Sequence, residues 1–211
     1  LRKNRMPPIS GLGKLNDFGM RQDIEEAGKI AGLNFKVDAI LNSRLEIVAL
    51  YAGDPVAEFY AGIPKAQELY GVPVQGEYDL VVVNANAKAT EAAISMHLAV
   101  SALKRGGTVV VVNNTPEGQV THYLLGPLGR ESGGRMWMGP SKLSRMGALI
   151  ILSEYPDLLS AKWFCEDERL QWAKNWQEVL DRLDCPDGEK DVLVLSDGTL
   201  QYFRPEGHSA Q

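Results

Sequence analysis

Features that would point to a particular class of protein are scarce in this sequence. Its 211 residues include only two cysteines, Cys165 and Cys185, and three histidines that lie far apart along the chain. A zinc site usually takes four Cys or His ligands that lie close together, so no metal site is predicted. Two free thiols are typical of a protein kept in a reducing compartment, and we expect a cytoplasmic location.

The chain also lacks a basic excess and a long apolar run. Its formal net charge is −5 and its pI is about 5.3, whereas nucleic-acid and membrane-surface binding both favour basic patches. The longest apolar runs, such as LVVVNA and TVVVVNN, have the length of a strand and fall short of the ~20 residues of a transmembrane helix. No charged-then-apolar signal segment opens the chain. We therefore expect neither nucleic acid nor a membrane as a partner.

Strand-like and helix-like segments alternate through most of the sequence. A helix is predicted over Met20–Ala31, and a β-hairpin is predicted from the runs NFKVDAIL and LEIVALYAG. Four buried strands then follow, in YDLVVVNA, GTVVVVNN, ALIILSE and KDVLVLSDG, with helical segments between them. This order predicts an α/β fold with a mostly parallel, Rossmann-like sheet and helices on both faces, plus an N-terminal helix and β-hairpin.

The pattern also gives boundaries for domains and elements. We interpret residues 1–18 as an extended N-terminal connector, 19–203 as a single α/β domain and 204–211 as a tail. Within the domain we expect a helix over 89–105 and an amphipathic helix over 166–183. The segment TLQYF is predicted to form a hairpin with the last strand.

A polar turn without glycine follows the first buried strand, in VVVNANAKATEAA. It does not match a glycine-rich phosphate loop. Ligands of open parallel sheets bind at the carboxyl ends of the strands, so Asn84, Asn86, Lys88 and Glu91 are candidate binding residues. Backbone amides at a helix start, together with Lys88, could hold an anion. Alternatively, the asparagines shape the turn and Thr90 or Glu91 caps the helix.

Two further segments carry candidate residues. Asn114 and Glu117 follow the second buried strand, where the alternative is a simple Pro-Glu-Gly turn. Trp137, in GGRMWMGP, could cover a ligand, or it could be a plug over the core. No spacing typical of a catalytic triad, a Cys-His pair or a metal site occurs. The residues alone thus predict an α/β domain with a polar cleft for a small molecule.

The order of several landmarks resembles the C-terminal domain of the nickel-dependent lactate racemase family. They begin with GMRQDIEEAGKIAGLNFKVDAILNSRLEIVALYAGDPVAEFYAG and continue with YDLVVVNA, LKRGGTVVVV and PEG. RMWMGPSKLSRMGALIILSE resembles the family's tryptophan-containing segment, and VLVLSDGTLQYF resembles its closing strand and turn. The resemblance covers roughly residues 19–203.

The resemblance implies a function for a longer protein. Members of that family interconvert stereoisomers of 2-hydroxy acids by hydride transfer, in an active site between two domains. Their nickel pincer nucleotide and catalytic residues belong to an N-terminal domain that has no counterpart here. The resemblance therefore implies a chain without catalytic residues, metal or bound cofactor of its own. Its partners would be a small-molecule substrate and its own N-terminal domain, while the oligomeric state is left open.

Two substrate contacts of the family differ in this sequence. The family's Tyr-Gln-x-x-Lys falls on residues 90–94, where Glu91 replaces the Gln and Ile94 replaces the Lys. Lys88 is then the cation in the preceding turn. Trp137 matches the family's tryptophan, but the Gln that follows it is Met138. An anionic Glu91 would disfavour an acidic substrate group unless Lys88 compensates, which puts lactate in doubt as the substrate.

Three hypotheses of function follow. The first is the substrate- and cofactor-side domain of a lactate racemase-like enzyme. The second is a non-catalytic module of the same fold that binds a small molecule, which the altered Tyr-Gln-x-x-Lys segment favours. The third is a nucleotide-binding domain, against which the missing glycine loop counts.

Overall fold

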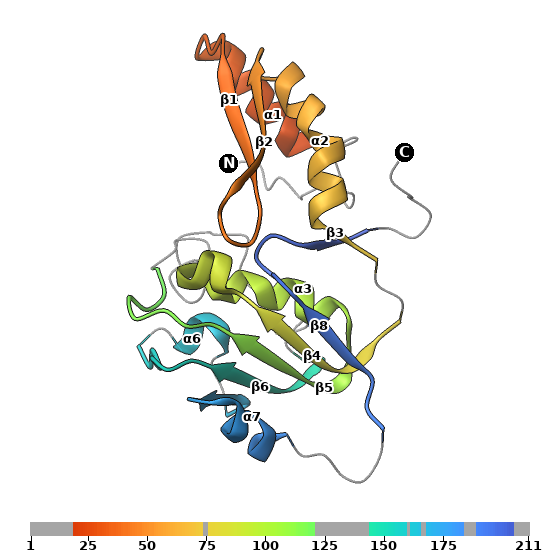
Figure 1. Ribbon diagram of the computed structural model, residues 1–211, viewed down its shortest axis with the longest axis vertical. Helices are drawn as coiled ribbons and strands as arrows, with labels where there is room; N and C mark the ends of the chain where they lie inside the picture. Colours follow the sequence, from red (N-terminus) through yellow and green to blue (C-terminus); the bar gives the residue numbers. More distant parts are fainter. Residues whose placement is uncertain are drawn as a thin grey trace, which may run out of the picture. The chain divides into compact units, whose positions relative to one another are not determined.

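The structure is a computed structural model, and it describes residues 19–73, 76–120, 144–159, 161–165, 168–183 and 189–204. The chain divides into two compact units, which we call the smaller unit (Leu1–Pro73 and Tyr202–Gln211) and the larger unit (Val74–Gln201) (Figure 1). The predicted boundaries at 18/19 and 203/204 stay a prediction, because a compact unit is not by itself an independently folding domain. None of the described helices is long and apolar enough to span a membrane.

The smaller unit contains the predicted N-terminal helix and hairpin. Its elements are α1 (Gly19–Ile30), β1 (Lys36–Leu41), β2 (Ile47–Gly53), α2 (Ala57–Tyr70), β3 (Gly71–Val72) and β9 (Tyr202–Phe203). Strands β1 and β2 pair antiparallel, which confirms the hairpin. Asp54 stabilises the turn that leads into α2, since its Oδ1 accepts hydrogen bonds from the amides of Val56 (3.0 Å) and Ala57 (2.9 Å). Both hydrogen bonds lower the pKa of Asp54, and the bond from the Ala57 amide has the larger effect.

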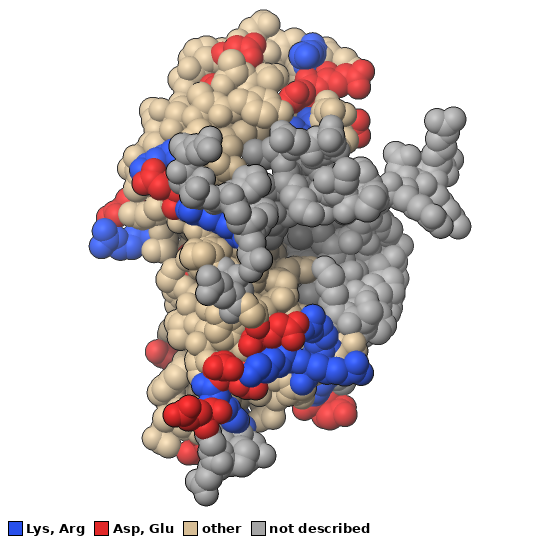
Figure 2. Space-filling view, turned by 90° about the vertical axis from the view of Figure 1, so that its right-hand side faces the viewer, with Lys and Arg blue, Asp and Glu red and all other residues tan. Residues whose placement is uncertain are grey.

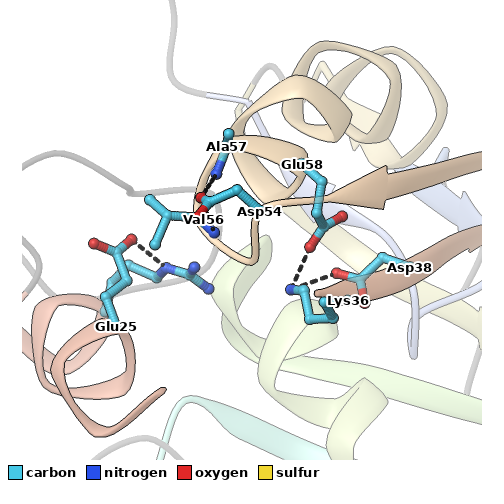
Figure 3. Close-up of polar contacts among 8 residues, drawn as sticks. Glu25, Lys36, Asp38, Asp54, Val56, Ala57 and Glu58 are labelled. Atoms are coloured by element: carbon cyan, nitrogen blue, oxygen red, sulfur yellow. Dashed lines mark hydrogen bonds and ion pairs between the residues drawn. The ribbon is translucent and has the colours of Figure 1, made fainter. Parts of the chain in front are cut away.

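An ion-pair cluster joins the hairpin to α2 (Figure 3). Lys36 Nζ lies 2.6 Å from Glu58 Oε1 and 2.8 Å from Asp38 Oδ2. The Glu58 side chain is only 3% exposed, so Lys36 supplies a cation beside a buried carboxylate. The hydrogen bond to Asp38, and then the one to Glu58, raises the pKa of Lys36. The face of the hairpin that carries Lys36 therefore lies against α2.

The larger unit is a five-stranded parallel sheet with the strand order β7-β6-β5-β4-β8. The strands are β4 (Tyr78–Asn84), β5 (Leu103–Val112), β6 (Met146–Leu152), β7 (Leu170–Ala173) and β8 (Val192–Leu195). The helices are η1 (Asn86–Ile94, a 3-10 helix), α3 (Ser95–Ser101), α6 (Ala161–Phe164) and α7 (Trp176–Arg182). The prediction of an α/β fold with a parallel sheet is confirmed.

Helices cover both faces of this sheet (Figure 1). On one face, α3 packs on β4 and β5, and Phe164 of α6 meets Trp172 of β7 edge to face at 6.2 Å. On the other face, Val179 of α7 packs with Val110 and Ile150 in a cluster of buried side chains. The central strands β4, β5 and β6 are apolar on both faces because both faces are covered, whereas Val192 and Val194 of the edge strand β8 are exposed. The helices lie on two faces because the crossovers are right-handed. The chain runs outward from β4 to β7 with its helices on one face, and it then returns past β4 to β8 with α7 on the other face.

One predicted helix is wrong, because part of its sequence forms the edge strand β7. Residues 166–183 do not form one amphipathic helix, because residues 170–173 form β7, which pairs with β6. Asn175 then begins α7, and its side chain accepts a hydrogen bond from the Glu178 amide. The Asn-x-x-Glu spacing of a capping box is the signal in the sequence for this later start.

Two other expectations are also wrong. Helix α3 ends at Ser101, and β5 already begins at Leu103, so the predicted helix over 89–105 is shorter and irregular at its start. The segment TLQYF does not form a hairpin with β8, because β9 pairs parallel with β3 in the smaller unit. Arg204 supports that pairing through a backbone bond to Val72 O and side-chain bonds to Gln67 O and Glu68 O.

Candidate functional site

The candidate site is the carboxyl edge of the five-stranded sheet, where ligands of such sheets bind. The loops at residues 84–95, 113–120, 153–159 and 196–201 follow β4, β5, β6 and β8 at this edge. The strand order places β8 beside β4, on the side opposite β5. The sheet therefore has its topological switch point between β4 and β8, directly where the glycine-free turn begins.

Asn84 ties the ends of these two strands together. Its Nδ2 donates a hydrogen bond to Ser196 O (3.0 Å), and its Oδ1 accepts one from the Asn86 amide (3.0 Å). Its backbone oxygen accepts a further bond from the Gly198 amide at 2.8 Å. Both ends of the Asn84 amide are thus engaged within the protein. The geometry favours the turn-shaping interpretation of this residue over direct ligand binding.

Asn86 and Asn114 continue the same arrangement toward β6. Asn86 Oδ1 accepts a hydrogen bond from the Asn114 amide (2.9 Å), and Asn114 Oδ1 accepts one from the Glu154 amide (3.0 Å). We call Asn84, Asn86 and Asn114 the asparagine ladder, because their hydrogen bonds connect the loops that follow β8, β4, β5 and β6, one after another across the sheet. Asn86 and Asn114 are exposed and keep their Nδ2 donors at the surface. The ladder holds the loops after β8, β4, β5 and β6 together at this edge.

Lys88 and Glu91 lie on η1, which is not a regular helix. The backbone leaves helical geometry at both residues, with φ −131° and ψ 60° at Lys88 and φ −123° and ψ 31° at Glu91. Lys88 is exposed and Glu91 is half-buried. Neither side chain forms an ion pair within the described part of the chain. Lys88 and Glu91 are therefore two opposite charges that form no ion pair with the other described residues.

Gln119, which is not among the predicted residues, holds η1 in this shape. Its Oε1 accepts a hydrogen bond from the Ala92 amide (3.0 Å), and its Nε2 donates one to Ala89 O (2.8 Å). The Val120 amide adds a bond to Thr90 O at 2.8 Å. Gln119 thus connects the loop after β5 to the segment that carries Lys88 and Glu91. No pattern in the sequence around it distinguishes this glutamine from an ordinary loop residue.

The turn before Gln119 requires its glycine. Gly118 has φ +73°, and a Cβ there would lie 2.7 Å from Asp157 Oδ2. That same carboxylate oxygen accepts a hydrogen bond from the Gln119 amide (2.9 Å). The predicted residue Glu117 accepts a bond from Thr115 Oγ1 (3.0 Å). Glu117 is therefore part of a Pro-Glu-Gly turn, as the alternative interpretation proposed, and its side chain is exposed.

Two polar residues at this edge are buried. Asn113 is 2% exposed and Asp197 is 3% exposed. Asp197 Oδ1 accepts hydrogen bonds from the Thr199 amide and hydroxyl and from the Leu200 amide. Asn113 Oδ1 and Asp197 Oδ2 have no hydrogen-bond partner among the described residues. Such atoms usually mark places where water or a ligand completes the structure.

The remaining predicted residue, Trp137, lies outside the described residues, so its role stays a prediction. Among the described residues, no cluster of three or more His, Cys, Asp and Glu side chains could hold a metal ion. On the face drawn in Figure 2, Lys and Arg side chains are interleaved with Asp and Glu, so no large patch of one sign appears among the residues coloured there.

The fold, in contrast to the sequence, matches a solved structure. No family model and no curated protein matches this chain. The solved structure of the lactate racemase apoprotein from Thermoanaerobacterium thermosaccharolyticum matches with a TM-score of 0.70 and 17% sequence identity. The match covers 94% of this chain and 52% of that chain. This protein therefore has a lactate racemase-like fold, and it spans about half the length of the relative.

Proposed function

We propose that this chain is the substrate- and cofactor-side part of a lactate racemase-like enzyme, which interconverts stereoisomers of a 2-hydroxy acid by hydride transfer. The observation that carries the proposal is the match of 94% of the chain to about half of a lactate racemase. A chain that corresponds to half of an enzyme is expected to hold one side of its active site. The chain alone would then be catalytically incomplete and would act together with an N-terminal domain.

The proposed substrate contacts lie on η1. Lys88 would pair with the substrate carboxylate, because it is an exposed cation at the carboxyl edge of the sheet. Glu91, three residues away, would accept a hydrogen bond from the substrate hydroxyl. Asn86 and Asn114 would donate from their exposed amide groups, and Asn84 and Glu117 would hold their loops in place. Trp137 would cover the ligand, as the family resemblance implies.

The opposite charges of Lys88 and Glu91 would set specificity. A carboxylate beside Glu91 alone would be repelled, whereas a carboxylate beside Lys88 with its hydroxyl toward Glu91 would be held in one orientation. The nickel pincer nucleotide, bound on the N-terminal domain, would supply the hydride-transfer chemistry. The residues of this chain would bind the substrate, orient it and exclude water from it.

Substitutions on η1 test this assignment in the longest native gene product, prepared together with the enzymes that make the cofactor. We expect Lys88→Ala to lower kcat/KM about 10- to 100-fold and Glu91→Ala about 10-fold, in line with the loss of one or two positioning contacts. The matched controls are Arg105→Ala and Glu189→Ala, at exposed positions near the amino-terminal ends of β5 and β8. Unchanged turnover in both η1 variants would show that the site is elsewhere.

The second candidate function is a binding module without chemistry. It is favoured by Ile94, which replaces the lysine of the family's Tyr-Gln-x-x-Lys segment. Calorimetry with a panel of 2-hydroxy acids separates the two functions. Binding that Lys88→Ala abolishes, combined with no turnover in a cofactor-loaded native product, would favour the module.

A further inference from the structure

The hairpin of the smaller unit has one covered face and one open face. Strands β1 and β2 pair Val37 with Ala52 and Ala39 with Leu50. Alternate residues of a strand point to opposite faces, so these four residues share one face with Val48. We call the five residues the open hairpin face. Val37 is 54% exposed and Leu50 is 61% exposed, and the other three are exposed as well.

Helix α2 covers the opposite face. Lys36 reaches Glu58 of α2 from that side, and the Tyr51 ring lies 3.3 Å from the position that a Cβ on Gly62 of α2 would occupy. Ile40, on the same side, is 8% exposed. The open hairpin face has no comparable cover within the described residues.

The distribution of polar residues in the hairpin departs from the usual one. In a hairpin with one face in water, charged residues normally alternate outward and apolar residues inward. Here Lys36 and Asp38 lie on the covered face, while the open hairpin face consists of Val, Leu and Ala alone. A two-stranded sheet is at best marginally stable by itself, and a stable α/β unit covers both faces of its sheet. This composition therefore fits a face that is buried in the working protein.

We infer that the open hairpin face is the docking surface for a further polypeptide segment with an apolar face, the counterpart of the part of the lactate racemase chain that this protein does not match. The fold of this chain accounts for 52% of the relative, which leaves nearly half of that chain to supply such a segment. The inference rests on the proposed function, because it assigns the surface through which the two parts of the enzyme would be held together. It adds the location of that surface and its apolar character.

Cysteine labelling tests the inference. Leu50→Cys and, separately, Val37→Cys are made in the 211-residue chain and in the longest native gene product, and maleimide labelling is followed peptide by peptide. Peptide-level readout keeps Cys165 and Cys185 apart from the introduced thiols. The control is Gln177→Cys on exposed α7 of the larger unit. In the 211-residue chain we expect the thiols of all three variants to react at similar rates.

In the longest native product we expect the thiols introduced by Leu50→Cys and Val37→Cys to react at least ten-fold more slowly than the thiol introduced by Gln177→Cys. Equal rates in that product overturn the inference, whether the product is longer than this chain or not. Protection that appears in this chain alone together with a dimer mass also overturns it, because the occupant is then a second copy. The labelling needs no substrate, so a protected hairpin in a product without turnover removes the proposed function and retains the docking surface.

Discussion

The central strands of the larger unit and the hairpin of the smaller unit differ in how far their apolar residues are buried. In the larger unit the central strands carry fully buried side chains, with Val81, Val83, Val109, Val110 and Val111 at 0% exposure. In the smaller unit, the hairpin of β1 and β2 leaves Val37 and Leu50 more than half exposed. Among the described residues, the larger unit has a buried core around its central strands, whereas the hairpin of the smaller unit has one apolar face that is exposed. A fold can therefore match a solved structure along nearly the whole chain and still leave an apolar face exposed.

The largest effect should separate the two units directly. Ile150→Ala removes a fully buried side chain from the sheet of the larger unit, which should lower the free energy of unfolding by about 2–5 kcal/mol. Leu50→Ala, on the open hairpin face, should change it by less than about 0.5 kcal/mol in the same chain. Urea denaturation followed by circular dichroism measures both. Similar losses for the two variants would remove the contrast.

The next effect concerns the ion pairs of the smaller unit. Lys36→Met leaves the buried carboxylate of Glu58 without its cation and should cost about 2–3 kcal/mol, less than a fully buried pair because Lys36 is partly exposed. Lys65→Met, which breaks the exposed pair with Glu68, should cost under about 1 kcal/mol. Thermal unfolding at neutral pH compares the two, and equal losses would show that burial of Glu58 adds nothing to the pair.

The same lysine predicts an alkaline loss of stability. The folded-state pKa of Lys36 is raised by Asp38 and Glu58. Its contribution is therefore complete below the ordinary lysine pKa and is lost as pH rises through the raised value. The stability of the Lys36→Met variant should therefore fall less steeply than that of the original protein as pH rises through this range. A variant that loses stability with pH as steeply as the original protein would show that other groups cause the fall.

A smaller effect is expected at the carboxyl edge of the larger unit. Gln119→Ala removes the hydrogen bonds to Ala89 and Ala92 and should lower the free energy of unfolding by about 1–2 kcal/mol. Amide hydrogen exchange over residues 88–94 should accelerate, while exchange in β5 and β6 should not change. Gln177→Ala on exposed α7 is the control. Unchanged exchange over residues 88–94 would mean that η1 holds its shape without Gln119.

The smallest effect is an acid response at the opposite end of the strands. Lys104 Nζ lies 2.9 Å from Asp79 Oδ2, and this bond, followed by the one from the Asp191 amide, lowers the pKa of Asp79. The stabilisation is complete above the ordinary Asp pKa and is lost as pH falls through the lowered value. The melting temperature of Asp79→Asn should therefore fall less than that of the original protein as pH drops below the ordinary Asp pKa of about 4. Identical acid curves for both proteins would show that the pair contributes nothing.

The sequence predicts the architecture better than the details of the site. Buried apolar strands such as VVV at 81–83 have one stable arrangement, a sheet covered on both faces, and this prediction is confirmed. The predicted helix over 166–183 is wrong because helical spacing there competes with pairing to β6, which acts between distant residues. The roles of the asparagine ladder are also beyond prediction, since the partners Ser196 and Glu154 are distant in sequence.

The measurement that tests the central claim most directly is the intact mass, nickel content and turnover of the longest native gene product, prepared with the enzymes that make the cofactor. We expect a product about twice the length of this chain that carries nickel and a covalent adduct and interconverts the stereoisomers of a 2-hydroxy acid. A native product of 211 residues, without nickel and without turnover of any 2-hydroxy acid, would contradict the proposed function.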